Sequence, residues 1–162
     1  MTAQEWGEHG GYDAPLATVR AHGPVTFGHQ TLLVRPQQGW ERLKGGAGTP
    51  PLRTPRGCLV FYHGVEGQCG ARCEPPRRYS AGILLLAACD PRKVVYRSAH
   101  SILAPDVPAE LAGVVPGVVF PTGVDVRRDG RLDVYYGMAD SRVGVAYAGL
   151  ADLLMPAQAY AA

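Results

Sequence analysis

The chain has 162 residues, of which 46% are hydrophobic and 19% are charged, so it fits one domain with a real core and excludes a globally disordered protein. Its formal net charge is +2 and its basic residues are scattered, which disfavours a nucleic-acid partner. Residues 1–9 lack the pattern of a secretory signal, and the longest apolar run, 83–89, is too short to cross a bilayer. We therefore expect a soluble cytoplasmic protein with no membrane partner.

The chain changes character at Gly57. Residues 1–56 are rich in Gly, Pro, His and Gln, and they contain one convincing strand candidate at 31–35. After Gly57, short β-type runs alternate with turn residues, which is typical of an all-β fold. The expected strands are 58–63, 81–88, 93–98, 114–120, 123–127, 131–136 and 143–148. One short helix is expected at 149–154.

Two turns support this order of strands. Residues 128–131 read Arg-Asp-Gly-Arg, and Asp-Gly between two β runs predicts a tight hairpin. Asp90-Pro91 similarly ends the preceding strand. A β-sandwich and part of a β-propeller both stack short antiparallel strands, so periodicity alone leaves these two architectures open.

A Gly-rich segment at residues 39–51 contains one lysine, Lys44, and ends in two prolines. Glycine lets a backbone approach a ligand closely, and the Lys44 ammonium could supply a point charge for an anion. The segment is no Walker loop, because it lacks the Gly-Lys-Ser/Thr that opens a helix. Its alternative interpretation is a surface loop.

His63 ends an apolar run and precedes Gly64. Its imidazole could donate to a phosphate or a sugar hydroxyl, or it could bond a neighbouring carbonyl and close the strand. Tyr62 is its neighbour, so in a regular strand the two side chains point to opposite faces.

Asp140 lies between two apolar segments that both read as strands, next to the tyrosine pair 135–136. A carboxylate on such a turn could accept backbone N–H groups, or it could bind the hydroxyls of a sugar. The local sequence leaves both roles open.

Signals for other chemistries are weak. Cys58 and Cys89 sit in apolar runs and look like small core residues. Cys69 and Cys73, with nearby His63, could form half of a metal site, but a zinc site usually takes four ligands from paired clusters, so we expect no metal. Gly-x-Ser-x-Gly, His-Glu-x-x-His and a strand-linked Gly-x-Gly-x-x-Gly are absent, which excludes enzymes of those kinds.

Several segments nevertheless form an ordered set. They are Trp40 through Lys44 to Gly48 with Pro50-Pro51, Leu59-Val-Phe-Tyr-His-Gly-Val65, 79–86, Asp90-Pro-Arg-Lys-Val94, Arg97-Ser98, Ile102-Leu103-Ala-Pro105, Val118-Val-Phe-Pro-Thr-Gly123 and 134–146. In this order, from about Trp40 to Leu154, the sequence resembles glycoside hydrolase family 130, a group of β-mannoside phosphorylases and hydrolases.

The resemblance implies a five-bladed β-propeller with its active site at one end of the central channel. It implies phosphate binding by Lys44 and His63, and substrate binding by Asp140, which would contact the mannosyl residue next to the cleaved bond, and by Tyr62. Inorganic phosphate would be a co-substrate, and no other cofactor is expected. In an inverting phosphorylase the phosphate itself attacks the sugar, so these two residues favour phosphorolysis over hydrolysis, which needs a carboxylate base to activate water.

The resemblance also implies that parts are missing. Family members are roughly twice this length, and their general-acid Asp belongs to an earlier blade in a segment resembling Glu-Asp-Pro-Arg, which residues 1–56 do not match. We expect a partial propeller of about two blades at 40–155, an irregular lead-in at 1–39 and a tail at 156–162. No catalytic residue is assigned. A complementing N-terminal half or a homo-oligomer is an expected partner, and the alternatives are a non-catalytic saccharide-binding or protein-interaction module and a truncated relic.

Overall fold

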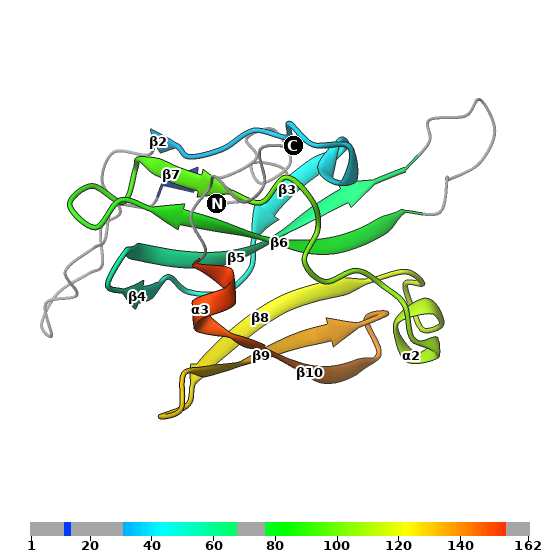
Figure 1. The fold of residues 1–162 in the computed structure, drawn as a ribbon. Coiled ribbons are helices and arrows are strands. Elements are labelled where there is room, and N and C mark those ends of the chain that lie inside the picture. The colour runs from blue at the N-terminus through cyan, green and yellow to red at the C-terminus, as the bar shows by residue number, and fades with distance from the viewer. Residues whose placement is uncertain (1–11, 14–30, 68–76, 155–162) are drawn as a thin grey trace, which may run out of the picture.

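The computed structural model describes residues 12–13, 31–67 and 77–154 of the chain. Strands dominate, in two antiparallel sheets and one small two-stranded ladder (Figure 1). In chain order the elements are β1 (Tyr12–Asp13), β2 (Thr31–Leu32), the 3-10 helix η1 (Gly39–Glu41), β3 (Lys44–Ala47), β4 (Leu52–Thr54), β5 (Gly57–Glu66), β6 (Arg78–Leu86), β7 (Val94–Arg97), α2 (Pro108–Leu111), β8 (Val119–Val126), β9 (Arg131–Met138), β10 (Arg142–Gly149) and α3 (Leu150–Leu153). Among these described residues, no helix is long and apolar enough to span a membrane.

Sheet 1 comprises β3 to β7. Its strands run in the order β3, β5, β6 and β7, and β4 pairs with β5 as well. Lys44 of β3 is opposite Val65 near the end of β5, whereas Leu52 of β4 is opposite Leu59 near its start. Thus β3 and β4 occupy the same edge of the sheet, one after the other, with a break between them that contains Pro50 and Pro51. Proline has no N–H to donate to a ladder, which accounts for the break.

Sheet 2 comprises β8, β9 and β10, in the order β10, β9, β8. The predicted Asp-Gly hairpin joins β8 to β9, with Gly130 at a φ of +85°. The run expected at 123–127 and the last two residues of the run expected at 114–120 belong to one strand, β8, whereas the strand expected at 114–117 is wrong, because those residues are bends. The pairing of β8 with β9 shifts register between Pro121 and Gly123, and that irregularity is what divided the sequence pattern.

The two sheets pack face to face, with sheet 2 below sheet 1 in Figure 1. The contact is a cluster of almost fully buried side chains, Leu59, Phe61 and Ile83 from sheet 1 and Leu132 and Val134 from sheet 2. Leu150 and Leu153 of α3 pack against the edge of this cluster. Alternate residues of each strand therefore hold the two layers together through apolar burial.

The other face of sheet 1 has its own apolar layer. Trp40 of η1 packs there on Val60, Tyr62 and Leu84, and Leu33 lies against the same cluster. The Trp40 and Tyr62 ring centroids are 5.4 Å apart. The segment that precedes β3, including η1, is thus packed on sheet 1 through buried side chains.

The predicted all-β class is confirmed, and the two packed sheets are the expected portion of about two propeller blades. The expectation of an irregular chain up to residue 56 is wrong for 44–54, where β3 and β4 form. Glycine and proline concealed these strands, because such residues disfavour strands on propensity alone and are tolerated at a sheet edge. Most of 1–39 and all of 156–162 lie outside the described residues, so the domain limits stay a prediction.

Candidate functional site

Aromatic and charged side chains form a row on the face of sheet 1 that looks toward sheet 2. The Lys44 Nζ lies 5.3 Å from the centre of the Tyr79 ring. The Tyr79 ring stacks on His63 with centroids 6.0 Å apart, and His63 lies 4.3 Å from the Phe120 ring of β8. We call these four residues the Lys–His row. It brings together Lys44 and His63, the two predicted phosphate ligands.

The register of sheet 1 explains the row. Lys44 and Tyr79 are both opposite Val65, and Gly46 is opposite His63, so all of these positions face the same side. A Cβ at Gly46 would overlap the His63 imidazole, which means that only glycine leaves room for the ring there. The Gly-rich segment therefore makes room for the His63 ring, and the sequence alone did not predict this role.

His63 is nearly buried, with 8% of the residue exposed. Burial lowers its pKa from 6.5 to about 4, and the nearby Lys44 charge acts in the same direction, while the contact with Ala47 opposes both. His63 is thus neutral at pH 7. The Nδ1 atom lies 3.1 Å from the Ala47 carbonyl oxygen, which can only accept, so the ring proton belongs on Nδ1. This leaves Nε2 as an acceptor for an O–H group.

Tyr62 faces the opposite side of sheet 1, as the alternation predicts. It is 2% exposed, and Arg97 Nε donates to its hydroxyl at 3.1 Å. Arg97 Nη2 in turn lies 2.6 Å from Glu41 Oε1. Burial raises the pKa of Tyr62 to about 12, although the Arg97 hydrogen bond opposes the rise. Its hydroxyl is therefore hydrogen-bonded to Arg97 on the η1 side of sheet 1, and the sheet separates it from the Lys–His row.

Asp140 lies in the turn between β9 and β10. Ala139 and Asp140 have φ values of 48° and 49°, and Ser141 N–H donates to the Met138 carbonyl at 3.1 Å. These two consecutive left-handed residues are the centre of the turn, and three residues, 139–141, separate Met138 from its strand partner Arg142. The backbone N–H and the hydroxyl of Ser141 both donate to the Met138 carbonyl and close the turn. The Asp140 carboxylate is exposed and makes no hydrogen bond or ion pair with another described residue.

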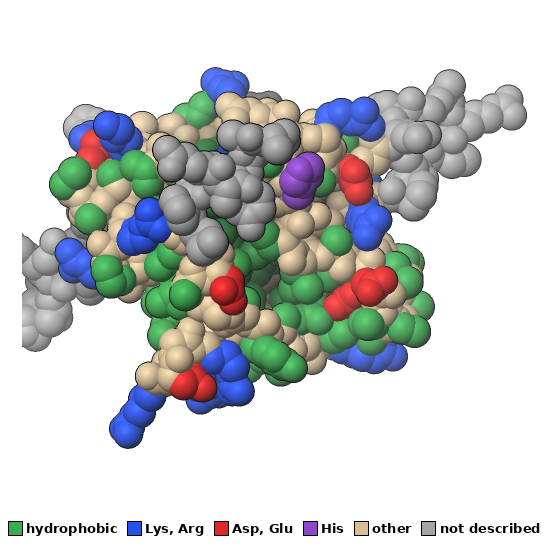
Figure 2. All heavy atoms as spheres, in the orientation of Figure 1, with side chains coloured by type: hydrophobic (Ala, Val, Ile, Leu, Met, Phe, Trp, Pro, Cys, Tyr) green, Lys and Arg blue, Asp and Glu red, His purple; other side chains and the backbone are tan. Residues whose placement is uncertain are grey.

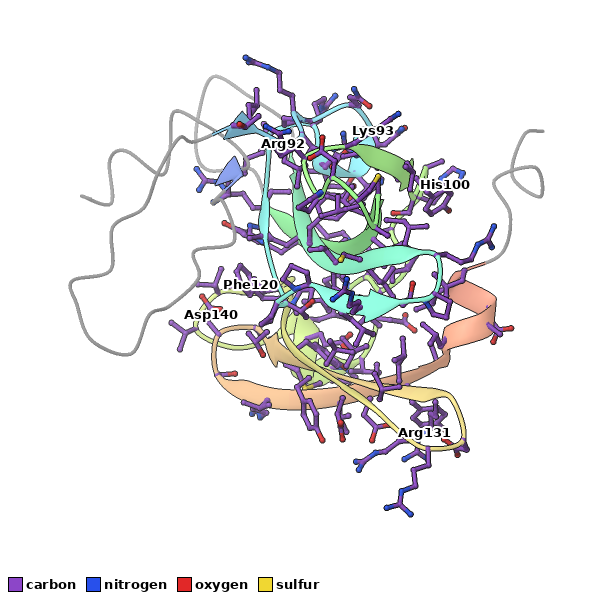
Figure 3. All side chains as sticks on the ribbon, turned by 90° about the vertical axis from the view of Figure 1, so that its left-hand side faces the viewer. Arg92, Lys93, His100, Phe120, Arg131 and Asp140 are labelled. Carbon is purple, nitrogen blue, oxygen red and sulfur yellow. The ribbon has the colours of Figure 1, made fainter. Side chains whose placement is uncertain are left out.

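This turn lies at the same end of the molecule as the Lys–His row. Tyr79 N–H donates to the Gly117 carbonyl at 2.9 Å, and Ala139 N–H donates to the Val118 carbonyl at 3.0 Å. One short stretch of chain thus bridges the row to the turn. Figure 3 shows Phe120 and Asp140 near one another, with Arg131 apart from both at the other hairpin of sheet 2.

Helix α2 holds that bridge in place through Glu110, which is 3% exposed. Tyr136 Oη donates to Glu110 Oε1 at 2.7 Å, and Asp106 N–H donates to Oε2 at 2.8 Å. Burial raises the pKa of Glu110, but these donors outweigh it and hold the pKa below its usual value. The Glu110 carbonyl also accepts from the Val118 N–H, which links the helix to the bridge.

Two other parts of the chain carry groups that could bind a ligand or a metal. Cys69 and Cys73 lie outside the described residues, and within the described part no three His, Cys, Asp or Glu side chains are grouped for a metal. A pocket of about 190 Å³ opens between sheet 1, the loop at 98–102 and α3, near His100, Ser101 and Asp152. Figure 2 shows hydrophobic side chains in the space between the two layers. The pocket includes none of the predicted site residues.

The Tyr79 side chain was missed by sequence reasoning. Its place in the row depends on the pairing of β5 with β6, which puts it opposite Val65. The available signal was the alternation of Tyr79, Ala81 and Ile83, which assigns Tyr79 to the face that carries the core.

The chain is similar in sequence and fold to several known proteins of one class. The chain is 36% identical over 129 residues to a β-1,4-mannooligosaccharide phosphorylase of Ruminococcus albus, covering 79% of this chain and 37% of that protein. It is 39% identical over 107 residues to a β-1,2-mannobiose phosphorylase of a Thermoanaerobacter species, covering 66% and 32%. The solved β-1,2-mannobiose phosphorylase of Listeria innocua, in complex with β-1,2-mannobiose, matches with a TM-score of 0.65 at 32% identity, over 79% and 34%. These three similar proteins are mannoside phosphorylases.

The family follows from the match to its model. Residues 22–156 match the family 130 glycoside hydrolase model, described as β-1,4-mannooligosaccharide phosphorylase. The chain belongs to glycoside hydrolase family 130, as the ordered segments predicted. It spans about a third of the length of the curated relatives it matches.

Proposed function

We propose that this chain provides part of the sugar and phosphate site of an inverting β-mannoside phosphorylase, and that it acts when the remaining blades are supplied. The observation that carries the proposal is the Lys–His row beside the Asp140 turn, in a chain whose relatives are mannoside phosphorylases. Tyr62 belongs to the proposal only as a support for β5, because its hydroxyl is engaged with Arg97.

The chemistry assigns a different task to each residue. In inverting phosphorolysis a phosphate oxygen forms a bond to the anomeric carbon while the bond from that carbon to the leaving sugar oxygen breaks, and a general acid gives that oxygen a proton. Lys44 would attract the phosphate as a point charge. Neutral His63 would accept from a protonated phosphate oxygen or from a sugar hydroxyl at Nε2, and Asp140 would accept from mannosyl hydroxyls.

The general acid is assigned to the blades that this chain does not match. On this proposal the chain alone binds its ligands and does not cleave a glycosidic bond. Mixing it with a polypeptide that carries the remaining blades, with inorganic phosphate and short β-mannosides, should release mannose 1-phosphate. Product formed by the chain alone, or no product from a mixture in which both polypeptides are shown to associate, would count against the proposal.

Phosphate binding by the chain alone is a separate prediction. Inorganic phosphate should raise the melting temperature of the wild-type chain, and Lys44→Met should remove the effect, because the variant keeps the length of the side chain and loses its charge. Lys93→Met is the matched control on the β7 side of sheet 1. An equal phosphate effect in wild type and Lys44→Met would exclude Lys44 as the anion site.

A second candidate is a non-catalytic module that binds a saccharide. The exposed Asp140 carboxylate, with no described partner, favours it because a sugar hydroxyl could be reached without any rearrangement. This function predicts a shift in melting temperature with a β-mannobiose that Asp140→Asn abolishes, and no response to phosphate. A response to phosphate that depends on Lys44 would decide for the first candidate.

A further inference from the structure

Glu41 is a buried carboxylate that the proposed sugar and phosphate chemistry does not use. None of its surface is exposed, although it lies in the three-residue helix η1 just before β3. Its Oε1 atom accepts from the backbone N–H groups of Gln37 at 3.2 Å and Gln38 at 3.0 Å. Burying a carboxylate is costly unless the charge is paired, so its place in the fold needs a physical reason.

Arg97 of β7 pairs with this charge and joins three parts of the chain. Its Nη2 atom lies 2.6 Å from Glu41 Oε1, and 11% of the Arg97 side chain is exposed. Its Nε donates to the Tyr62 hydroxyl of β5 at 3.1 Å, and its Nη1 donates to the Arg35 carbonyl at 2.8 Å. The planar guanidinium therefore ties η1 and the segment before it to two strands of sheet 1.

Two glycines let η1 lie directly on sheet 1. A Cβ at Gly64 would overlap the side chains of Glu41 and Trp40. A Cβ at Gly82 would overlap the Trp40 ring. Because Gly64 follows His63 in β5, the alternation of the strand puts η1 and the His63 ring on opposite faces. Helix η1 thus supports, from the far face, the part of β5 that carries the Lys–His row.

The same helix leads directly into the strand that carries Lys44. Only two residues separate Glu41 from Lys44, and the second of them, Leu43, donates its N–H to the Val65 carbonyl at 2.9 Å. Strand β3 has four residues, and its two central residues are glycines, which contribute little to a strand. The position of β3 therefore depends on how its ends are held.

We infer that the Glu41–Arg97 ion pair positions Lys44, by fixing η1 on sheet 1, and so sets the affinity of the chain for phosphate. This inference rests on the proposed phosphate site and adds two positioning residues to it. Both lie on the face of sheet 1 opposite the Lys–His row, so their effect passes through the backbone of β3. Loss of either partner leaves the other buried without its counter-charge, and η1 then separates from the sheet to regain water.

Charge and position predict opposite results for Glu41→Ala. This variant removes a negative charge, so by Coulomb attraction alone phosphate would bind more tightly. The positioning role predicts that phosphate binds about tenfold more weakly, because Lys44 loses its fixed place. Arg97→Met should weaken binding too, although it changes the net charge in the other direction. A loss of affinity in both variants is therefore the result expected of positioning.

The test is isothermal titration calorimetry of the full chain with inorganic phosphate, at a temperature at which circular dichroism shows every variant to be folded. Glu41→Gln is the conservative variant, because its amide oxygen can still accept from the two backbone N–H groups and from Arg97. It should bind phosphate within about threefold of the wild-type affinity.

Two further variants are controls. Leu132→Ala reduces stability in the contact between the sheets, away from η1, and tests for a general effect of destabilisation. Arg53→Met removes an exposed positive charge from the same edge of sheet 1 as β3, and tests for a general effect of charge. Both should bind phosphate as wild type does.

Hydrogen exchange supplies a readout that needs no ligand. The Leu43 amide, which donates to the Val65 carbonyl, should exchange faster in Glu41→Ala than in wild type. The Ala139 amide, which donates to the Val118 carbonyl, should exchange at the wild-type rate, because it lies in sheet 2.

The outcomes separate this inference from the proposed function. Tighter or unchanged phosphate binding by Glu41→Ala would overturn the inference, and so would a loss of affinity that Leu132→Ala reproduces. A wild-type chain that does not bind phosphate would refute the proposed phosphate site instead. Exchange of the Leu43 amide would then decide alone whether the ion pair fixes β3, and equal rates in Glu41→Ala and wild type would refute that as well.

Discussion

At the scale of single residues, His63 makes a measurable contribution to the dependence of stability on pH. Its pKa of about 4 in the folded chain lies below the value of 6.5 for a free imidazole. Between these two pH values the imidazole is protonated in the unfolded chain and neutral in the folded chain. The stabilisation is complete above pH 6.5 and is lost as pH falls from 6.5 toward 4. The loss amounts to about 3 kcal/mol over that window.

Replacing His63 tests this directly. His63→Gln should flatten the decline in the free energy of unfolding between pH 6.5 and 4.5, because glutamine has no proton to gain. Urea denaturation at several pH values provides the measurement, and His100→Gln, outside the Lys–His row, is the control. A wild-type slope that survives in His63→Gln would show that another group titrates in this window.

Asp140 allows its charge to be separated from its backbone role. Its φ of 49° suits asparagine almost as well as aspartate, so Asp140→Asn should unfold at the wild-type free energy within about 0.5 kcal/mol. The same variant should lose binding of β-mannobiose, followed by isothermal titration calorimetry. Asp129→Asn in the other hairpin serves as the control and should bind as wild type does. Asp140→Val, by contrast, should destabilise the chain, since a β-branched residue is strained at this φ.

At the scale of elements, the attachment of α2 is expected to be a strong local determinant of stability. Glu110 accepts from Tyr136 and from two backbone N–H groups, all in a site with little solvent. Glu110→Ala should therefore lower the free energy of unfolding by about 2–4 kcal/mol, and Tyr136→Phe by about 1–2 kcal/mol. Thermal denaturation followed by circular dichroism measures both.

The exposed pair of Asp90 and Arg92 provides the comparison for this prediction. Asp90→Asn should leave the melting temperature unchanged within error, because ion pairs in solvent contribute little. If Glu110→Ala lowered the melting temperature no more than Asp90→Asn does, Glu110 would not be what attaches α2 to sheet 2.

The elements also show which parts of the fold a sequence can reveal. Strands such as β5 and β9 were predicted because alternation and apolar content are local, and the Asp-Gly hairpin was predicted because its turn chemistry is local. Strand β3 was missed because Gly45 and Gly46 carry no strand signal, and it forms only through pairing with β5. Strand β8 was divided in two because Pro121 and Gly123 interrupt its pattern.

The candidate site follows the same rule. Lys44 and His63 were selected one by one, but their common face is set by the register of β3 against β5. Tyr79 joins them through the register of β5 against β6, which no single segment discloses. The opposite orientation of Tyr62 was predicted, because it needs only the two-residue period of a strand.

At the scale of the whole molecule, the two sheets should unfold as one cooperative unit. Their contact is built from Leu59, Phe61 and Leu132, which are at most 2% exposed. Leu132→Ala should lower the free energy of unfolding by about 2–5 kcal/mol and shift the circular dichroism and fluorescence transitions together. Exposed Val126 on the same sheet gives the control, Val126→Ala. Separate transitions for the two probes would mean that each blade is stable alone.

The docking of η1 on sheet 1 gives the molecule a built-in optical reporter. Trp40 is 9% exposed and its ring packs at a tilt against Tyr62, so its emission should lie at short wavelength while η1 is packed on sheet 1 and should move toward the red when η1 is released. The chain has one other tryptophan, Trp6, and a Trp6→Phe variant would leave Trp40 as the sole source of the signal. Fluorescence of that variant would then follow the covering of one blade face by the chain itself, independently of any ligand bound on the other face.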